Sequence, residues 1–119
     1  MVNGIYTSLS ALRAFAKSMA VTSNNVANSL SKGYKKSRAI LEQGQNGALG
    51  VVIQKIDTPG APISYPDGLN GTKQVEETSN VDLAEEMVNM ITDQRGFEAN
   101  LRSVKTKEEL EETILNILA

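Results

Sequence analysis

Two heptad-patterned segments, one near each end of the 119-residue chain, constrain its fold more than any other feature. In residues 5–30, side chains that are apolar except for Ser23 recur at steps that alternate between four and three residues. Residues 83–104 repeat the same spacing, with Gln94 as the one polar member. Because this is the a/d pattern of helices that wind around each other, we predict that the two terminal helices pair as a coiled coil.

The predicted helix-pairing interface consists of the apolar members of both stripes. The N-terminal helix contributes Ile5, Leu9, Leu12, Ala16, Met19, Val26 and Leu30. The C-terminal helix contributes Leu83, Met87, Met90, Phe97, Leu101 and Val104. The rest of the N-terminal helix is rich in Ser, Thr and Asn, which indicates close packing on more than one side because small uncharged groups are easier to desolvate than charges.

The middle of the chain changes character after Gly33, which is a plausible stop for the first helix. The segments 34–43 and 49–56 carry β-branched residues on either side of Gln45-Asn46-Gly47, which predicts a β-hairpin. All three prolines fall in residues 58–71, which we predict to be a loop. A further short extended segment is predicted at 72–75.

We therefore predict a mainly α fold with a small β middle. Residues 1–33 form the N-terminal helix of a coiled-coil domain, and residues 81–119 form its C-terminal helix. Between them, residues 34–80 form a short β-hairpin and loop insertion. Asn80 or Asp82 can cap the second helix.

The apolar stripe of the second helix moves after Val104. Leu110, Ile114 and Ile117 lie roughly half a turn around from the earlier stripe, at about 100° per residue. The helix either breaks and restarts at a capping box formed by Thr106 and Glu109, or it continues and turns its tail to a different neighbour. We favour a partner-subunit interface at these three residues.

Composition excludes most catalytic chemistry, since the chain has no Cys and no His. Disulfides, thiolate nucleophiles, His-ligated metals and Ser-His triads are therefore impossible. Neighbouring carboxylates such as Glu85 and Glu86 point in different directions on a helix and cannot share a metal or a proton. We predict no enzyme activity, no catalytic residues, no metal and no cofactor.

The charge is unevenly spread, although the overall net charge is only -2. Residues 1–33 hold three basic and no acidic residues, whereas residues 81–119 hold four basic and nine acidic ones. Ends of opposite sign attract each other within a chain or between chains. The basic cluster Lys35-Lys36-Ser37-Arg38 is better explained as a charged strand edge than as a nucleic-acid site.

The N-terminus is not expected to be a secretory signal, because Thr7, Ser8, Ser10 and Arg13 interrupt any apolar run. No stretch approaches the ~20 apolar residues of a membrane span, so no direct membrane insertion is expected. If the protein leaves the cytoplasm, we expect a route that needs no cleaved signal.

The sequence motifs at both ends resemble those of the bacterial flagellar axial proteins, the rod and hook family. The resemblance rests on Ser23 to Asn28 with Gly33-Tyr34-Lys35, and on Asn80 to Ile91 with Asp93 to Asn100. Ser31 stands where the family motif usually has Thr. The motif residues carried over are Asn24, Asn25, Ala27, Asn28, Gly33, Tyr34, Asn80, Val81, Asp82, Leu83, Glu86 and Met87.

This resemblance implies a structural subunit of the flagellar basal-body rod, most like a short proximal rod protein. Its terminal helices would pair within a self-assembling helical tube in the periplasm that serves motility. Its partners would be copies of itself, other rod and hook proteins and the flagellar type III export apparatus, with no nucleic acid and no small-molecule substrate. The alternative is a cytoplasmic helical adaptor or export chaperone-like protein that mimics axial-protein ends.

Overall fold

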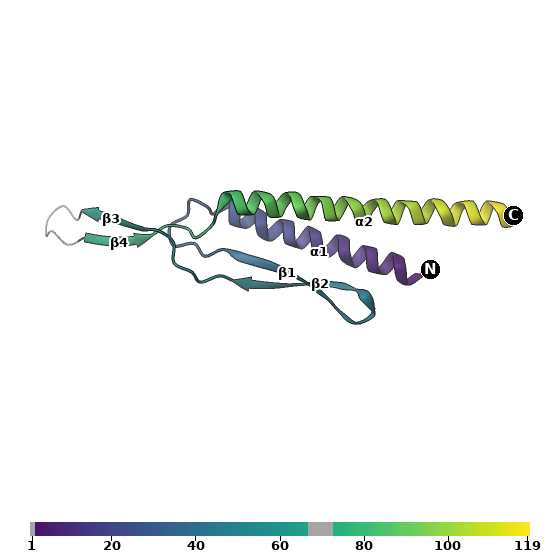
Figure 1. The fold of residues 1–119 in the computed structure, drawn as a ribbon, viewed down its shortest axis with the longest axis horizontal. Coiled ribbons are helices and arrows are strands. Elements are labelled where there is room, and N and C mark those ends of the chain that lie inside the picture. Colours follow the sequence, from purple (N-terminus) through teal and green to yellow (C-terminus); the bar gives the residue numbers. More distant parts are fainter. Residues whose placement is uncertain (1, 67–72) are drawn as a thin grey trace.

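The computed structural model describes residues 2–66 and 73–119. The molecule measures 86 × 24 × 15 Å, and its two helices lie side by side and antiparallel (Figure 1). The predicted mainly α fold with a small β middle is confirmed at this level. Whether the helices wind around each other as a coiled coil stays a prediction.

The first helix, α1 (Val2–Ala27), ends three residues before the last member of its predicted stripe, Leu30. The Asn28 side chain donates to the Asn24 carbonyl at 2.9 Å and to its Oδ1 at 2.8 Å, which satisfies acceptors in the last turn. Gly33 lies beyond this end with φ of 66°, a left-handed conformation that favours glycine. The predicted helix stop was therefore several residues too late.

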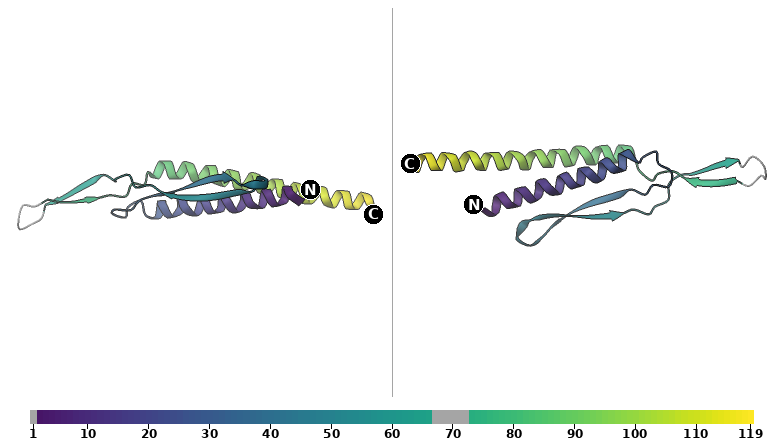
Figure 2. Two further views of the ribbon diagram at one scale, coloured as in Figure 1. Left: turned by 90° about the horizontal axis from the view of Figure 1, so that it is seen from below. Right: turned by 180° about the vertical axis from the view of Figure 1, so that it is seen from behind.

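The predicted hairpin is confirmed, as β1 (Ser37–Gln43) pairs antiparallel with β2 (Leu49–Lys55). The turn between them is the short η1 (Gln45–Gly47), in which Asn46 and Gly47 have positive φ, the conformation that Asn and Gly tolerate best. The hairpin runs along α1, and the Leu49 amide donates to Ser10 Oγ at 3.0 Å (Figure 2).

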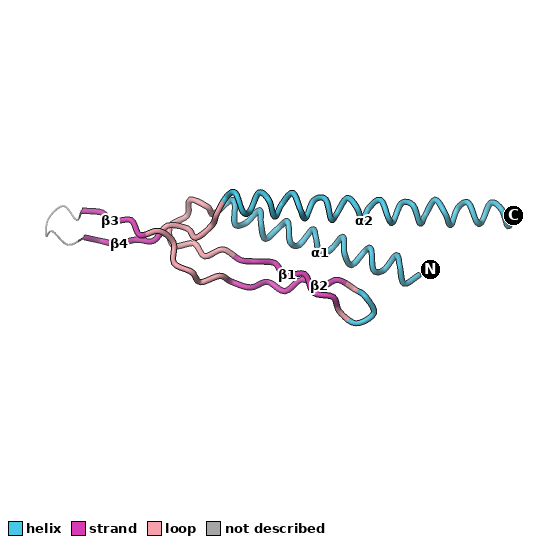
Figure 3. The backbone as a smooth tube through the Cα atoms, in the orientation of Figure 1, coloured by secondary structure: helices cyan, strands magenta, loops and turns pink. Residues whose placement is uncertain are grey.

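A second hairpin, formed by β3 (Pro62–Pro66) and β4 (Lys73–Glu77), projects away from the helices (Figure 3). The loop prediction was wrong for residues 62–66, and the rest of that prediction from 67 onwards lies outside the described residues. Pro62 and Pro66 occupy the two ends of a strand in a two-stranded sheet, where a missing N–H is tolerated. Lys32 anchors this hairpin through an ion pair with Glu76.

The second helix, α2 (Leu83–Leu118), continues without a break through Thr106, so the continuous alternative is correct and the capping-box break is not. At ~1.5 Å per residue it is about 54 Å long. Asp82 caps it by accepting from the amides of Ala84 at 2.9 Å and Glu85 at 3.3 Å. The acidic first turn adds a favourable interaction with the helix dipole.

The hydrophobic core is thin. Within the described part of the chain, the buried apolar residues are Ala11 and Ala14, and buried polar residues outnumber them. Large apolar side chains such as Met87, Ile91 and Leu101 are more than half exposed. No helix in the described residues is long and apolar enough to cross a membrane.

Candidate functional site: the junction of the terminal helices

Four contacts define how α1 meets α2. Ser18 Oγ donates to Asp93 Oδ2 at 2.5 Å, and Asn25 Nδ2 donates to Glu86 Oε2 at 3.1 Å. The space beside Gly96 is filled by the Phe15 ring, and that beside Gly4 by the Lys107 side chain. From one contact to the next, the number of residues moved forward along α1 equals the number of residues moved backward along α2. The helices therefore keep one antiparallel register along their shared length.

Apart from the Phe15 ring, the face of α1 toward α2 is polar and small rather than aliphatic. We call this face, together with the facing residues of α2, the polar seam. Its buried members, each less than a tenth exposed, are Ser8, Ala11, Ser18, Thr22, Asn25, Glu86 and Asp93. Polar groups in such a seam are stabilising only if they are paired, and no described buried side-chain N or O lacks a hydrogen-bond partner.

The predicted α1 stripe lies one residue after the observed seam at every position, which is a rotation of about 100°. Leu9, Ala16 and Leu30 are exposed, the last at 96%. Their place in the helix-pairing interface stays a prediction. Ile5, Leu12, Met19 and Val26 are half-buried beside the seam. The sequence prediction assigned the apolar stripe to the contact between the helices, whereas the small polar residues of the seam are the ones that are buried there.

The predicted apolar stripe of α2 is also only partly buried. Leu83, Met87 and Leu101 are about half exposed, and their role in helix pairing stays a prediction. Met90, Phe97 and Val104 are half-buried and lie along the edge of the seam. The tail residues are exposed as well, and their predicted role at a subunit interface stays a prediction; they are Leu110, Ile114 and Ile117.

Asn25 is the most deeply buried side chain of the junction, at 1% exposure. Its amide Nδ2 also donates to the Ser37 carbonyl at 2.7 Å, and its Oδ1 accepts from the Ser37 amide at 3.0 Å. The Tyr34 hydroxyl donates to the same Oδ1 at 3.2 Å. One side chain therefore joins α1, the start of β1 and, through Glu86, the first turns of α2.

Asn80 plays a second linking role just before α2. Its Oδ1 accepts from the Lys36 amide at 2.6 Å, and its Nδ2 donates to the carbonyls of Ile56 at 2.8 Å and Thr58 at 2.9 Å. Its own amide donates to the Tyr34 carbonyl at 3.2 Å. One amide side chain just before α2 thus holds both the segment before β1 and the segment between β2 and β3.

The structure brings together part of the family motif. Asn25, Tyr34, Asn80 and Glu86 meet at this junction through the bonds above, and Asp82 caps α2 beside them. The other motif residues are exposed or lie near the junction without joining its elements; they are Asn24, Ala27, Asn28, Gly33, Val81, Leu83 and Met87. The motif residues at the junction act as hydrogen-bonding positioners.

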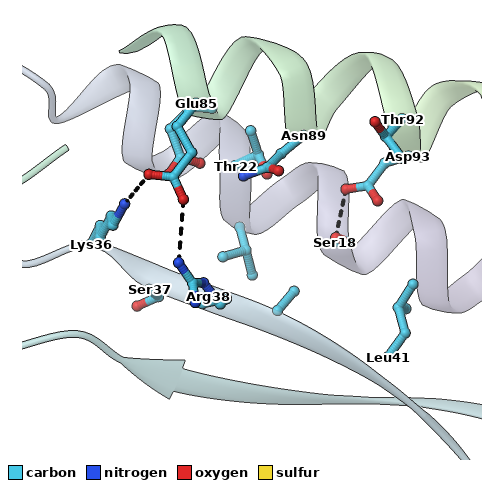
Figure 4. Close-up of a pocket in the computed structure, with 13 residues that line it drawn as sticks. Ser18, Thr22, Lys36, Ser37, Arg38, Leu41, Glu85, Asn89, Thr92 and Asp93 are labelled. Atoms are coloured by element: carbon cyan, nitrogen blue, oxygen red, sulfur yellow. Dashed lines mark hydrogen bonds and ion pairs between the residues drawn. The ribbon is translucent and has the colours of Figure 1, made fainter. Parts of the chain in front are cut away.

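A charged cluster closes the junction beside β1 (Figure 4). Lys36 Nζ donates to Glu85 Oε2 at 2.6 Å, and Arg38 Nη2 donates to Glu85 Oε1 at 3.2 Å. These groups line a polar cavity of about 280 Å³ between α1, α2 and β1, with Asn89 and Thr92 on its α2 wall. Lys36 is only 8% exposed and pairs with Glu85, so the start of β1 is tied to α2 by charge as well as by packing.

The hydrogen bond from Lys36 lowers the pKa of the Glu85 carboxyl from its ordinary value of 4.5, and the charges of Lys36 and Arg38 act in the same direction. A carboxyl with a lowered pKa in the folded state stabilises the fold above its unfolded pKa, and that contribution is lost as the pH falls through the lowered value. We expect the unfolding free energy of the wild type to fall more steeply below about pH 4.5 than that of Glu85→Gln.

Urea denaturation at a series of pH values would measure this difference. Glu112→Gln, at an exposed position with no ion pair among the described residues, is the matched control and should follow the wild type. Parallel stability curves for wild type and Glu85→Gln would contradict the assignment of Glu85 as the linking carboxylate.

The hydrogen bonds and ion pairs of the junction hold α1, α2 and β1 in position relative to one another. In the described ranges, no group of three or more acidic side chains is placed to hold a metal ion. Sequence reasoning missed Ser8, Ser18 and Thr22 as seam residues. The available signal was the four-and-three spacing of small residues one position before the apolar stripe, together with the richness of this helix in Ser, Thr and Asn.

Two family models match the two ends of the chain. The model described as "Flagella basal body rod protein" matches residues 5–35. The model described as "Flagellar basal body rod FlgEFG protein C-terminal" matches residues 73–117. These ranges contain α1 with the turns that follow it, and α2 with β4, so both walls of the junction are covered.

Curated relatives agree with these models. The flagellar basal-body rod protein FlgG of Buchnera aphidicola subsp. Acyrthosiphon pisum is 44% identical over 63 residues, 50% of this chain and 24% of that protein. The hook protein FlgE of Escherichia coli K12 is 44% identical over 41 residues, 34% of this chain and 10% of the hook protein. FlgE of Helicobacter pylori strain 26695 is 46% identical over 41 residues, 34% of this chain and 6% of its own length. The chain therefore spans a quarter or less of these relatives.

Proposed function

Since the chain belongs to the flagellar rod and hook family of axial proteins, we propose that it is a structural, self-assembling subunit of the flagellar basal body. We place it in the rod rather than the hook. The longer stretch of similarity to rod protein FlgG, 63 residues against 41 for FlgE, supports this assignment.

The observation that carries the proposal is the apolar surface left open on α2. Leu83, Met87, Val88, Ile91 and Leu101 are all between 46% and 63% exposed. Several large apolar side chains exposed along one helix mark an interface with another protein, because their contact with water is unfavourable. The paired helices are thus built to be covered by neighbours.

Copies of this chain and other axial proteins are the proposed neighbours, and the flagellar type III apparatus is the proposed export route. The proposed location is the periplasmic rod, where the subunit would transmit rotation for motility. The two helical stripes that flank the polar seam would then form contacts between subunits rather than within one. On this proposal, the residues predicted to form the coiled coil make their contacts in the assembled state.

Substitution of Leu101 by Ala tests this reassignment. Because Leu101 is 51% exposed in the single chain, we expect the unfolding free energy of the dilute protein to change by no more than about 0.5 kcal/mol. In the assembled state the same side chain is buried, so the concentration required for assembly should rise by about tenfold or more. Urea denaturation and sedimentation of the purified chain measure the two effects.

Ser103→Ala, at another exposed α2 position, serves as the control and should leave assembly unchanged. If Leu101→Ala destabilised the dilute chain by several kcal/mol, the side chain would belong to the fold of one subunit instead. A protein that stayed monomeric and bound another export substrate at fixed stoichiometry would favour the cytoplasmic adaptor.

A further inference from the structure

A groove of about 470 Å³ lies between the N-terminal half of α1 and the start of β2. Its apolar lining includes Leu9, Leu49 and the buried Ala14, and its edge carries two cations, Arg13 and Lys17. Since a cavity of about 150 Å³ holds one benzene molecule, the groove has room for more than one aliphatic side chain.

The two cations have no carboxylate partner in the described structure. The ion pairs found in residues 2–66 and 73–119 use Lys32, Lys35, Lys36, Arg38 and Lys105. Arg13 and Lys17 are both exposed and lie one helical turn apart on α1. The groove therefore offers an apolar floor beside a doubly positive edge.

The tail of α2 has the complementary character. Leu110 is 56% exposed, Ile114 42% and Ile117 77%, with the i, i+4, i+7 spacing of a helix that docks into a groove. Residues 108–119 hold four glutamates and no basic residue. Glu109 and Glu111 flank Leu110 at about 100° on either side, so the apolar stripe has acidic borders.

The tail cannot reach the groove of its own chain. Lys107 lies beside Gly4, near the start of α1, and from there the straight α2 runs on past α1 (Figure 1). Leu118 is about 16 Å farther along the helix axis than Lys107, in the direction away from Arg13 and Lys17. An occupant with this chemistry must come from another molecule.

We propose that the acidic, apolar tail of α2 docks into this groove on a second copy of the chain. Leu110, Ile114 and Ile117 supply the apolar anchors, and Glu109 and Glu111 meet Arg13 and Lys17. The inference rests on the proposed self-assembly and names the surfaces that carry it. Because the two surfaces differ, each copy offers one of each, and the contact propagates from head to tail instead of closing as a two-fold dimer.

Charge reversal tests the docking. One variant carries Arg13→Glu and Lys17→Glu, and the other carries Glu109→Lys and Glu111→Lys. Each variant alone should require at least about tenfold more protein to assemble, because like charges then face each other. An equal mixture should assemble again, since the reversed groove of one variant fits the reversed tail of the other, and the two native surfaces also match.

Lys55→Glu with Arg102→Glu is the control, a double reversal at exposed positions that should assemble like the wild type. Circular dichroism checks that every variant keeps its helices. Because the chain has no cysteine, Ala48→Cys in one copy and Ile117→Cys in another should also form a disulfide on oxidation. A Ser64→Cys copy, with its thiol on β3, should not cross-link to Ile117→Cys.

Variants that assemble as well as the wild type alone, or a mixture that shows no recovery, would overturn the docking. Wild-type assembly that needs a different axial protein would overturn the choice of a second copy. The proposed function fails on a separate observation, namely absence of the chain from isolated basal bodies. The chain could be present there while the charge reversals have no effect, so the two failures are distinguishable.

Discussion

Replacing Asn25 by Ala is expected to lower the unfolding free energy of the single chain by about 2–4 kcal/mol. The substitution removes both hydrogen bonds to the Ser37 backbone, the acceptor of the Tyr34 hydroxyl and the donor to Glu86. Glu86 is only 3% exposed, so its carboxylate would be left buried without this donor. Stranded buried polar groups cost more than the lost bond itself.

Urea denaturation followed by helical circular dichroism would measure the loss. Asn24→Ala, at the exposed neighbouring position, is the matched control and should cost about 0.5 kcal/mol or less. A double variant, Asn25→Ala with Glu86→Leu, removes the stranded carboxylate and should lose about 1–3 kcal/mol less than the sum of the single variants. Equal costs for Asn25→Ala and Asn24→Ala would show that the junction does not depend on Asn25.

Gly96→Ala is expected to be destabilising despite the higher helix propensity of Ala. A Cβ at this position would lie 2.5 Å from the Phe15 ring, so the ring or the helices must move. Such overpacking typically costs about 1–3 kcal/mol, which exceeds the gain of about 1 kcal/mol from replacing a helical Gly. We expect a net loss of up to about 2 kcal/mol in the unfolding free energy.

The sign should reverse when Phe15 is removed. In a Phe15→Ala background the steric conflict is gone, so Gly96→Ala should stabilise the chain by about 1 kcal/mol through helix propensity alone. The four unfolding free energies of this cycle are measured under the same conditions. Stabilisation by Gly96→Ala in both backgrounds would mean that α1 and α2 do not approach each other closely at this contact.

Patterns with a local physical cause were readable from the sequence. β-branched residues around the Gln45-Asn46-Gly47 turn predicted the first hairpin, and Asn80 or Asp82 before an acidic turn predicted the start of α2. The second hairpin was missed because its prolines read as a loop signal. Only the pairing with β4, a non-local contact, shows that Pro62 and Pro66 lie at the ends of a strand.

The polar seam was missed for a different reason. A heptad stripe of Leu, Ile and Met predicts that a helix face will be covered, but it does not identify the molecule that covers it. Here the single chain pairs its helices through Ser18, Asn25, Glu86 and Asp93, and it leaves Leu83, Met87 and Leu101 exposed. Small polar residues permit close approach of two backbones, while the apolar stripes remain available for neighbours.

The division between a polar seam within the chain and apolar stripes around it has a consequence for assembly. Hydrogen bonds fix one antiparallel register before any neighbour binds, because a shifted register would separate buried donors from their acceptors. In the proposed assembly, the apolar faces would then stabilise each contact between subunits. On this account the junction motif shapes the subunit, and the exposed stripes join subunits together.

The most direct test of a structural role in the flagellum is quantitative mass spectrometry of purified hook–basal bodies from cells that produce this chain. The account predicts that the chain is found in the rod fraction in multiple copies, at a fixed ratio to other rod proteins. Its absence from that fraction, with the protein recovered in the cytoplasm bound to an export substrate, would contradict the account and support the adaptor.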